Sequence, residues 1–192
     1  MKERKYKEEY KLETQLDVKT GKPRQIPVYM GDYYHLEAGK RAIAIACWLP
    51  LAAYLVLYAV YMLLDSPSAR CIYVMPIAAC ATIPTLYAVL GALSALRAPQ
   101  KMTRVERETG VGRVMRSMIG CGTVTALSCV GDAVFMLRNG FAGEMPAFLM
   151  LLGACAAAWW GLARSRALYH SVTVIPGLAA KEAEKAKEAV NA

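Results

Sequence analysis

Four apolar stretches occupy most of the chain and limit its fold more than any other feature. Each contains between 19 and 26 residues, and only the third includes a charged side chain, Asp132. About 20 apolar residues form a helix long enough to cross the ~30 Å hydrocarbon core of a bilayer. The sequence therefore predicts an all-α membrane protein, a four-transmembrane-helix bundle with spans at residues 42–64, 71–96, 117–137 and 145–163.

Basic residues divide unequally between the segments that flank these stretches. Of the 23 lysines and arginines, 21 lie in residues 1–41, 97–116 and 164–192, whereas only Arg70 and Arg138 lie in the other two loops. Loops rich in Lys and Arg stay on the cytoplasmic side. We therefore expect a multi-pass protein of a bacterial plasma membrane with both termini in the cytoplasm. The net charge of +8 follows from this distribution, with anionic lipid as its counter-charge, and does not indicate nucleic-acid binding.

The apolar stretches also divide the chain into parts. Residues 1–41 form a cytoplasmic segment, residues 42–163 the membrane domain and residues 164–192 a cytoplasmic tail. The charged start of the chain lacks the pattern of a cleavable signal peptide, so we expect the first span to direct insertion. Five of the six cysteines lie well inside spans, Cys71 lies at the outer end of the second span, and no Cys-x-x-Cys pair occurs, which gives no support to a disulfide framework or a zinc site.

The N-terminal segment has the pattern of a β-hairpin at about residues 10–30. Apolar and polar residues alternate over Tyr10–Val18 and again over Arg24–Met30, with turn chemistry between them. Pro27 removes a hydrogen-bond donor, so the second strand should expose an edge there. We expect the apolar face to be buried, with Ser171–Ile175 as a third strand. This face comprises Tyr10, Leu12, Leu16, Val18, Ile26 and Val28.

Two other segments outside the spans are rich in charge. Residues 101–116 form either a short interfacial helix broken near Gly110 and Gly112 or a solvated basic loop that fixes the topology. Residues 181–192 consist of good helix formers without an apolar stripe, so we expect a frayed, solvent-exposed tail.

Polar residues recur on one face of the third stretch. Ser117, Cys121, Thr125, Ser128 and Asp132 have the spacing of a single helical stripe. A carboxylate inside a membrane is costly and is a candidate functional group by default. The alternative is a packing role, in which an arginine of the adjoining loops (Arg70 or Arg138) or a tyrosine holds the carboxylate. No second carboxylate lies within a span, which argues against a carboxylate-pair mechanism. The candidate intramembrane polar site comprises Asp132, Ser128, Thr125, Tyr58 and Tyr61.

The tyrosines of the first span and the prolines of the second span each have two interpretations. Tyr54, Tyr58 and Tyr61 share one helical face and indicate either an aromatic belt and packing or a site. Pro76 and Pro84 break the second span, either as a functional hinge or as an ordinary membrane-helix feature.

Small residues mark candidate faces for helix packing. In the fourth span they recur every four residues, a pattern that allows close approach either inside the bundle or between copies in a homo-oligomer. The third span carries further glycines, and we expect it at the centre of the bundle. The candidate packing residues are Gly153, Ala157, Gly161, Gly120 and Gly131.

No catalytic motif is present: there is no phosphate-binding loop, zinc-binding His-Glu-x-x-His pair or nucleophile elbow. His35 and His170 flank the first and last spans, but two histidines alone give poor support for a metal site. We expect no enzymatic activity, cofactor or metal. The favoured function is an accessory or assembly subunit of a membrane complex that presents the hairpin to a protein partner. The alternative is a small oligomeric transporter or channel with Asp132 in its path.

Overall fold

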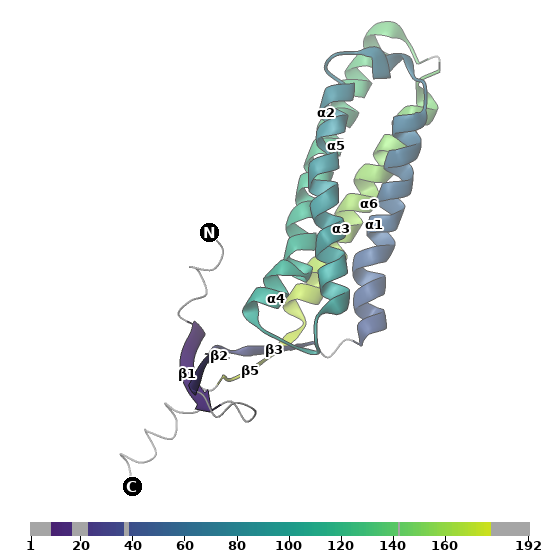
Figure 1. The fold of residues 1–192 in the computed structure, drawn as a ribbon. Coiled ribbons are helices and arrows are strands. Elements are labelled where there is room, and N and C mark those ends of the chain that lie inside the picture. The colour runs from purple at the N-terminus through teal and green to yellow at the C-terminus, as the bar shows by residue number, and fades with distance from the viewer. Residues whose placement is uncertain (1–8, 17–22, 37–38, 142, 178–192) are drawn as a thin grey trace, which may run out of the picture. The chain divides into compact units, whose positions relative to one another are not determined.

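The structure of the chain is a computed structural model, and it describes residues 9–16, 23–36, 39–141 and 143–177 (Figure 1). The predicted hairpin turn and the predicted frayed tail at residues 181–192 lie outside the described residues. The chain separates into two compact units. The first draws on Met1–Glu37, Pro99–Val105 and Val172–Ala192, and the second on Ala38–Ala98 and Glu106–Ser171.

The second unit is a helical bundle whose rods are each long and apolar enough to cross a membrane. The prediction of four such helices is confirmed. They are α1 (Lys40–Leu63), α2 and α3 in succession (Met75–Cys80 and Thr82–Arg97), α5 (Val111–Asn139) and α6 (Met145–His170). In Figure 1, α2 and α3 follow one another along a single rod. Helix α6 packs against α1 and α5, and α3 packs against the same two helices, which closes the bundle.

Small side chains predominate on the buried faces of α3 and α6, whereas many large apolar side chains lie on the outside of the bundle. The buried positions of α3 and α6 are mostly alanine and glycine, and leucines such as Leu63, Leu127 and Leu149 are exposed. Water-soluble proteins bury most of their large apolar side chains, and extended apolar surfaces mark contact with another apolar phase. Together with helix length, this arrangement indicates a multi-pass membrane protein whose outer surface faces lipid.

A proline explains the break between α2 and α3. Pro84 has no amide hydrogen, and a proline ring collides with the carbonyl group four residues earlier, here that of Cys80. Helix α2 ends at that residue, and Ala81 separates it from α3. The Tyr58 hydroxyl donates to the nearby Ala78 carbonyl oxygen at 2.9 Å, which gives the interrupted backbone ladder a further partner. The predicted start of this span at residue 71 is early by four residues.

The basic segment between the second and third spans is helical from Arg104 onward, so the alternative of a loop is wrong for most of it. Helix α4 (Arg104–Thr109) ends in a bend at Gly110, and α5 begins at the next residue. A side chain at Gly110 would lie 3.2 Å from the Ala95 Cα atom of α3. The bend therefore occurs where α3 approaches closely. Gly112, by contrast, lies inside α5.

The first unit contains two small sheets. Strands β1 (Tyr10–Leu16) and β2 (Pro23–Tyr29) pair antiparallel with Tyr10 opposite Tyr29, as the hairpin prediction requires. A second sheet has the order β4-β3-β5, with β3 (Tyr33–Leu36) between β4 (Lys101–Met102) and β5 (Val172–Ile175). Strand β5 is thus a strand as predicted, but its partner is β3 and the prediction that it joins the hairpin is wrong.

The hairpin face is also less buried than predicted. Leu12 is 64 % exposed and Tyr10 is exposed. Val28 pairs with Lys11, so it lies on the opposite face of the hairpin from Tyr10 and Leu12, and the prediction that these three residues share one face is wrong. Among the described residues this face is covered only in part, because Tyr29 beside Tyr10 packs against Tyr33 of β3, whereas Leu12 stays exposed. The side chains of Leu16, Val18 and Ile26 lie outside the described residues.

Candidate functional site

The polar stripe of α5 faces the bundle interior, and all five of its side chains are buried. The Thr125 hydroxyl donates to the Cys121 carbonyl oxygen at 2.7 Å, and the Ser128 hydroxyl donates to the Val124 carbonyl oxygen at 3.1 Å. Each hydroxyl thus bonds one turn back along its own helix. These bonds satisfy both hydroxyl groups inside the bundle, and neither bond involves Asp132.

Asp132 shares its end of the bundle with a second buried carboxylate, Glu144. The two residues are 0 % and 1 % exposed, respectively, and they are close enough to interact electrostatically. Glu144 directly precedes α6, and its Oε1 atom accepts the backbone N–H of Ser68 at 2.7 Å. Glu144 lies just outside the fourth apolar stretch, so a count of carboxylates inside the spans does not include it. The sequence feature that could have identified Glu144 is its position immediately before the fourth apolar stretch.

Two further elements close over these carboxylates. Helix α1 contributes Tyr61, whose hydroxyl interacts electrostatically with both, and the 3-10 helix η2 (Pro67–Arg70) contributes Ser68. The Ser68 hydroxyl bonds Ser66 at 3.1 Å. We call Tyr61, Ser68, Asp132 and Glu144 the acidic cluster. The Ser68 hydroxyl also interacts with the Asp132 carboxylate. Within the described part of the chain, no hydrogen-bond partner reaches Glu144 Oε2 or the Tyr61 hydroxyl.

The expected arginine partners of Asp132 lie elsewhere. Arg70 pairs with Asp65 at 3.3 Å, and both side chains are largely exposed. Arg138 is also exposed. The prediction that one of them neutralises Asp132 is therefore wrong. The reason lies in η2, where Ser68 is fully buried while Arg70 faces outward.

The predicted intramembrane site is only partly assembled. The structure brings Tyr61 to Asp132, whereas Tyr58 stacks on Tyr54 with 5.6 Å between the ring centroids and bonds Ala78. Thr125 lies seven residues before Asp132 on α5, about 10 Å away at 1.5 Å per residue. All three tyrosines of α1 are buried in the bundle, so the interpretation of Tyr58 and Tyr61 as a lipid-facing aromatic belt is wrong.

The small residues of the third and fourth spans lie where helices approach one another. A Cβ atom added at Gly161 would lie 3.0 Å from Met118 Sδ and 3.2 Å from Pro50 Cβ. The corresponding nearest distances are 3.2 Å at Gly153, 3.0 Å at Gly120 and 3.7 Å at Gly131, and Ala157 is buried in the core. The face of Gly153, Ala157 and Gly161 is thus inside the bundle and approaches α1 and α5.

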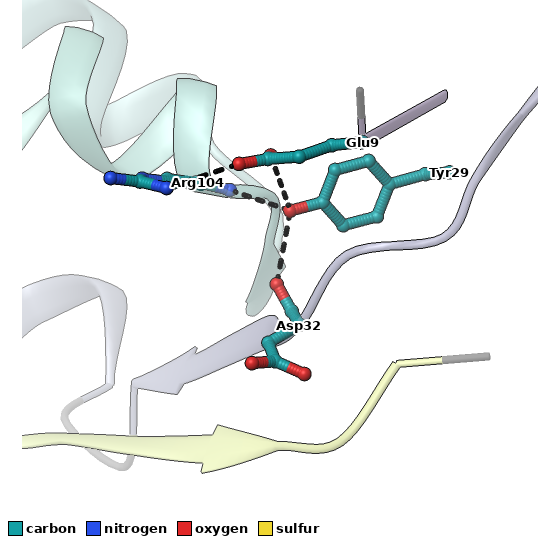
Figure 2. Close-up of polar contacts among 4 residues, drawn as sticks. All are labelled: Glu9, Tyr29, Asp32 and Arg104. Carbon is teal, nitrogen blue, oxygen red and sulfur yellow. Dashed lines mark hydrogen bonds and ion pairs between the residues drawn. The ribbon is translucent and has the colours of Figure 1, made fainter. Parts of the chain in front are cut away.

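A second polar site lies in the first unit, around Tyr29 (Figure 2). The Tyr29 hydroxyl oxygen lies 3.1 Å from Glu9 Oε2 and 3.1 Å from the Asp32 carbonyl oxygen, and it shares its single hydrogen between them. It accepts the backbone N–H of Arg104 at 3.4 Å. The Arg104 side chain pairs with Glu9 Oε1 at 3.2 Å. We call Glu9, Tyr29, Asp32 and Arg104 the Tyr29 network.

Aromatic packing supports the Tyr29 network. The Tyr29 ring meets Tyr10 of β1 and Tyr33 of β3 edge to face, with centroids 5.2 and 5.1 Å apart. Burial raises the pKa of the Tyr29 hydroxyl to about 12, so the phenol stays protonated at neutral pH. Tyr29 therefore holds together the hairpin, the second sheet and the start of α4 by both its ring and its hydroxyl.

The two histidines belong to different units, His35 to β3 and His170 to α6. Across the described residues, no group of three or more His, Cys, Asp and Glu side chains is arranged to hold a metal ion. Comparisons with protein-family models, curated proteins and solved structures gave no match. The function of the chain has to be argued from its own geometry.

Proposed function

We propose that this chain is a non-enzymatic accessory or assembly subunit of a plasma-membrane complex. Its helical unit anchors it in the bilayer, and its β1–β2 hairpin binds a protein partner. The observation that carries the proposal is the exposed apolar face of β1, where Leu12 is 64 % exposed beside the exposed Tyr10.

The two edges of the hairpin differ in what they offer a partner. Strand β2 carries Pro23 and Pro27, which have no amide hydrogen and so blunt an edge. Strand β1 contains no proline. An added strand would therefore pair with β1, where main-chain hydrogen bonds give affinity and side chains such as Leu12 give specificity.

The Tyr29 network supports this proposal because it holds the hairpin in place. Two strands alone are marginally stable in water. The ring contacts and hydrogen bonds of Tyr29 connect them to β3 and to Arg104 of the same unit. A pre-ordered hairpin loses less conformational freedom on binding, which favours affinity.

The transport alternative has less support. Asp132 is 0 % exposed and lies under Tyr61 and η2, and the Tyr58 hydroxyl engages the interrupted backbone near Pro84. Because Asp132 is occluded and the backbone near the break before Pro84 is hydrogen-bonded, the bundle is better explained as a packed anchor than as an open transport path.

The proposed orientation has a direct test. The 21-to-2 distribution of basic residues predicts that the hairpin lies in the cytoplasm and that the loop after α5 lies outside. In a cysteine-free background, Asn139→Cys should react with an impermeant maleimide in intact cells, whereas Thr14→Cys should react only after the membrane is opened. Both positions are exposed. Labelling of Thr14→Cys in intact cells would reverse the orientation.

Site-specific photo-crosslinking tests the partner. A photo-reactive residue at Leu12, on the apolar face, should give one discrete adduct in native membranes. The same residue at Lys11, which is exposed on the opposite face, is the matched control and should give little or none. Tyr10→Asp in the Leu12 probe should abolish the adduct. If both positions crosslink equally, or Tyr10→Asp has no effect, the hairpin face is not the binding surface.

A further inference from the structure

We propose that the acidic cluster binds one small hard cation, of the alkali or alkaline-earth class, in an occluded site at this end of the bundle. The site would be formed by Asp132 of α5 and Glu144 before α6, with Tyr61 of α1 and Ser68 of η2 beside them. This inference does not depend on the proposed function, because it concerns the helical unit alone.

The buried charge of the two carboxylates favours a bound cation. Two carboxylates at 0 % and 1 % exposure are strongly disfavoured as bare anions, because burial removes their hydration. The two arginines of the adjoining loops do not compensate them, since Arg70 pairs with Asp65 and Arg138 is exposed. The N-terminus of α6 offsets part of the charge at Glu144, which directly precedes it. Asp132 lies in the C-terminal half of α5, where the helix dipole gives no such help, and the Ser68 hydroxyl beside it carries no charge.

The oxygen atoms available at the acidic cluster suit a hard cation. Glu144 Oε2 and the Tyr61 hydroxyl are buried and have no hydrogen-bond partner among the described residues, and the buried Asp132 carboxylate lies beside the Ser68 hydroxyl. Tyr61 is 3 % exposed, and its hydroxyl interacts with both carboxylates. Hydroxyl and carboxylate oxygens are the ligands that hard cations prefer. The unpartnered Tyr61 hydroxyl is an observation separate from the two carboxylates, and it points to the same site.

A cation at the acidic cluster would connect several elements of the bundle. Its ligands come from α1, α5 and the start of α6, and Glu144 Oε1 is already bonded to the Ser68 backbone of η2 at 2.7 Å. A cation here would cross-link both connecting loops to the bundle. Its role is then to stabilise this end of the fold, and its occupancy should appear as ligand-dependent stability.

The test is thermal unfolding of the purified full chain in detergent at fixed pH and ionic strength. Choline chloride is replaced stepwise by the chloride of Na⁺, K⁺, Ca²⁺ or Mg²⁺. At least one of these cations should raise the unfolding temperature by several degrees in a saturable manner. The radioactive form of that cation should bind with a stoichiometry near one. No saturable response to any of the four cations would mean that the carboxyls hold protons only, and the proposal would fail.

Variants test whether the cation binds at the acidic cluster. In Asp132→Asn/Glu144→Gln we expect the apparent affinity to fall by about 100-fold or more, since even residues that only support a metal ligand contribute about 10- to 100-fold. Unfolding in choline should change little, because the amides keep the shape without the charge. Asp65→Asn, an exposed carboxylate at the same end, is the control and should bind like the wild type. If the double variant does not fold, Tyr61→Phe replaces it and should weaken binding about tenfold. Unchanged affinity in either variant would place the ion elsewhere and overturn the proposal.

Discussion

Leucine in place of Gly91 is expected to destabilise the helical bundle more than any other single change at a glycine. Gly91 lies on α3 where α5 comes closest, and even a Cβ atom there would lie 2.9 Å from the Val114 backbone nitrogen. The obstructing atom belongs to a helix backbone and cannot rotate away. Overpacking of this kind costs about 1–3 kcal/mol and occasionally more, so we expect at least about 3 kcal/mol for leucine. The measurement is thermal unfolding of purified protein in detergent.

A matched pair of smaller changes separates sterics from helix propensity. Alanine is favoured over glycine inside a helix by about 1 kcal/mol. Gly131→Ala should realise this gain or be neutral, because the nearest atom to its new Cβ is 3.7 Å away, on Val74. Gly91→Ala should instead lower the unfolding temperature despite the same gain in propensity. If both alanine variants shift stability in the same direction, α3 and α5 are not packed as closely as the structure has them.

The helical unit was largely predictable because its signals are local. Apolar length alone located the four rods, and the polar stripe ending at Asp132 correctly identified the buried face of α5. The break near Pro84 follows from the geometry of proline. These inferences need only the periodicity of one helix and the thickness of a bilayer.

The partners of Asp132 could not be predicted in the same way. Which residue meets Asp132 depends on how η2 folds over the end of the bundle. That turn buries Ser68 and exposes Arg70, although the charge of Arg70 made it the obvious candidate. Glu144 was overlooked because it lies one residue outside a span. Both errors arose from assigning residues to loops by sequence position, whereas burial in a loop is decided by tertiary contacts.

The strands show the same limit. The period-two pattern correctly indicated β1 and β2, whose register matches Tyr10 with Tyr29. Strand β5 was recognised from its β-branched residues, but its pairing with β3 joins segments more than 130 residues apart. Strands β3 and β4 have four and two residues, respectively, which is too short for an alternating pattern to register.

Loss of the Tyr29 side chain is expected to release the hairpin from the rest of the first unit. Tyr29 is 7 % exposed, and both its edge-to-face contacts and its hydroxyl bonds join separate segments. Truncation of a buried aromatic residue to alanine costs about 3–5 kcal/mol. A two-stranded sheet has little stability of its own to set against this loss. Tyr29→Ala should therefore accelerate tryptic cleavage at the exposed Lys11 by more than about tenfold, while membrane insertion stays intact.

Tyr29→Phe divides the effect between ring and hydroxyl. The phenylalanine keeps both aromatic contacts and loses only the bonds to Glu9, Asp32 and the Arg104 backbone. A typical hydrogen bond contributes about 1 kcal/mol, and the Arg104–Glu9 ion pair at 3.2 Å remains. Cleavage of Tyr29→Phe should thus fall between that of the wild type and that of Tyr29→Ala. If the wild type is cut at Lys11 as fast as Tyr29→Ala, the network does not hold the hairpin. The pre-ordered edge on which the proposed partner binding depends would then be lost with it.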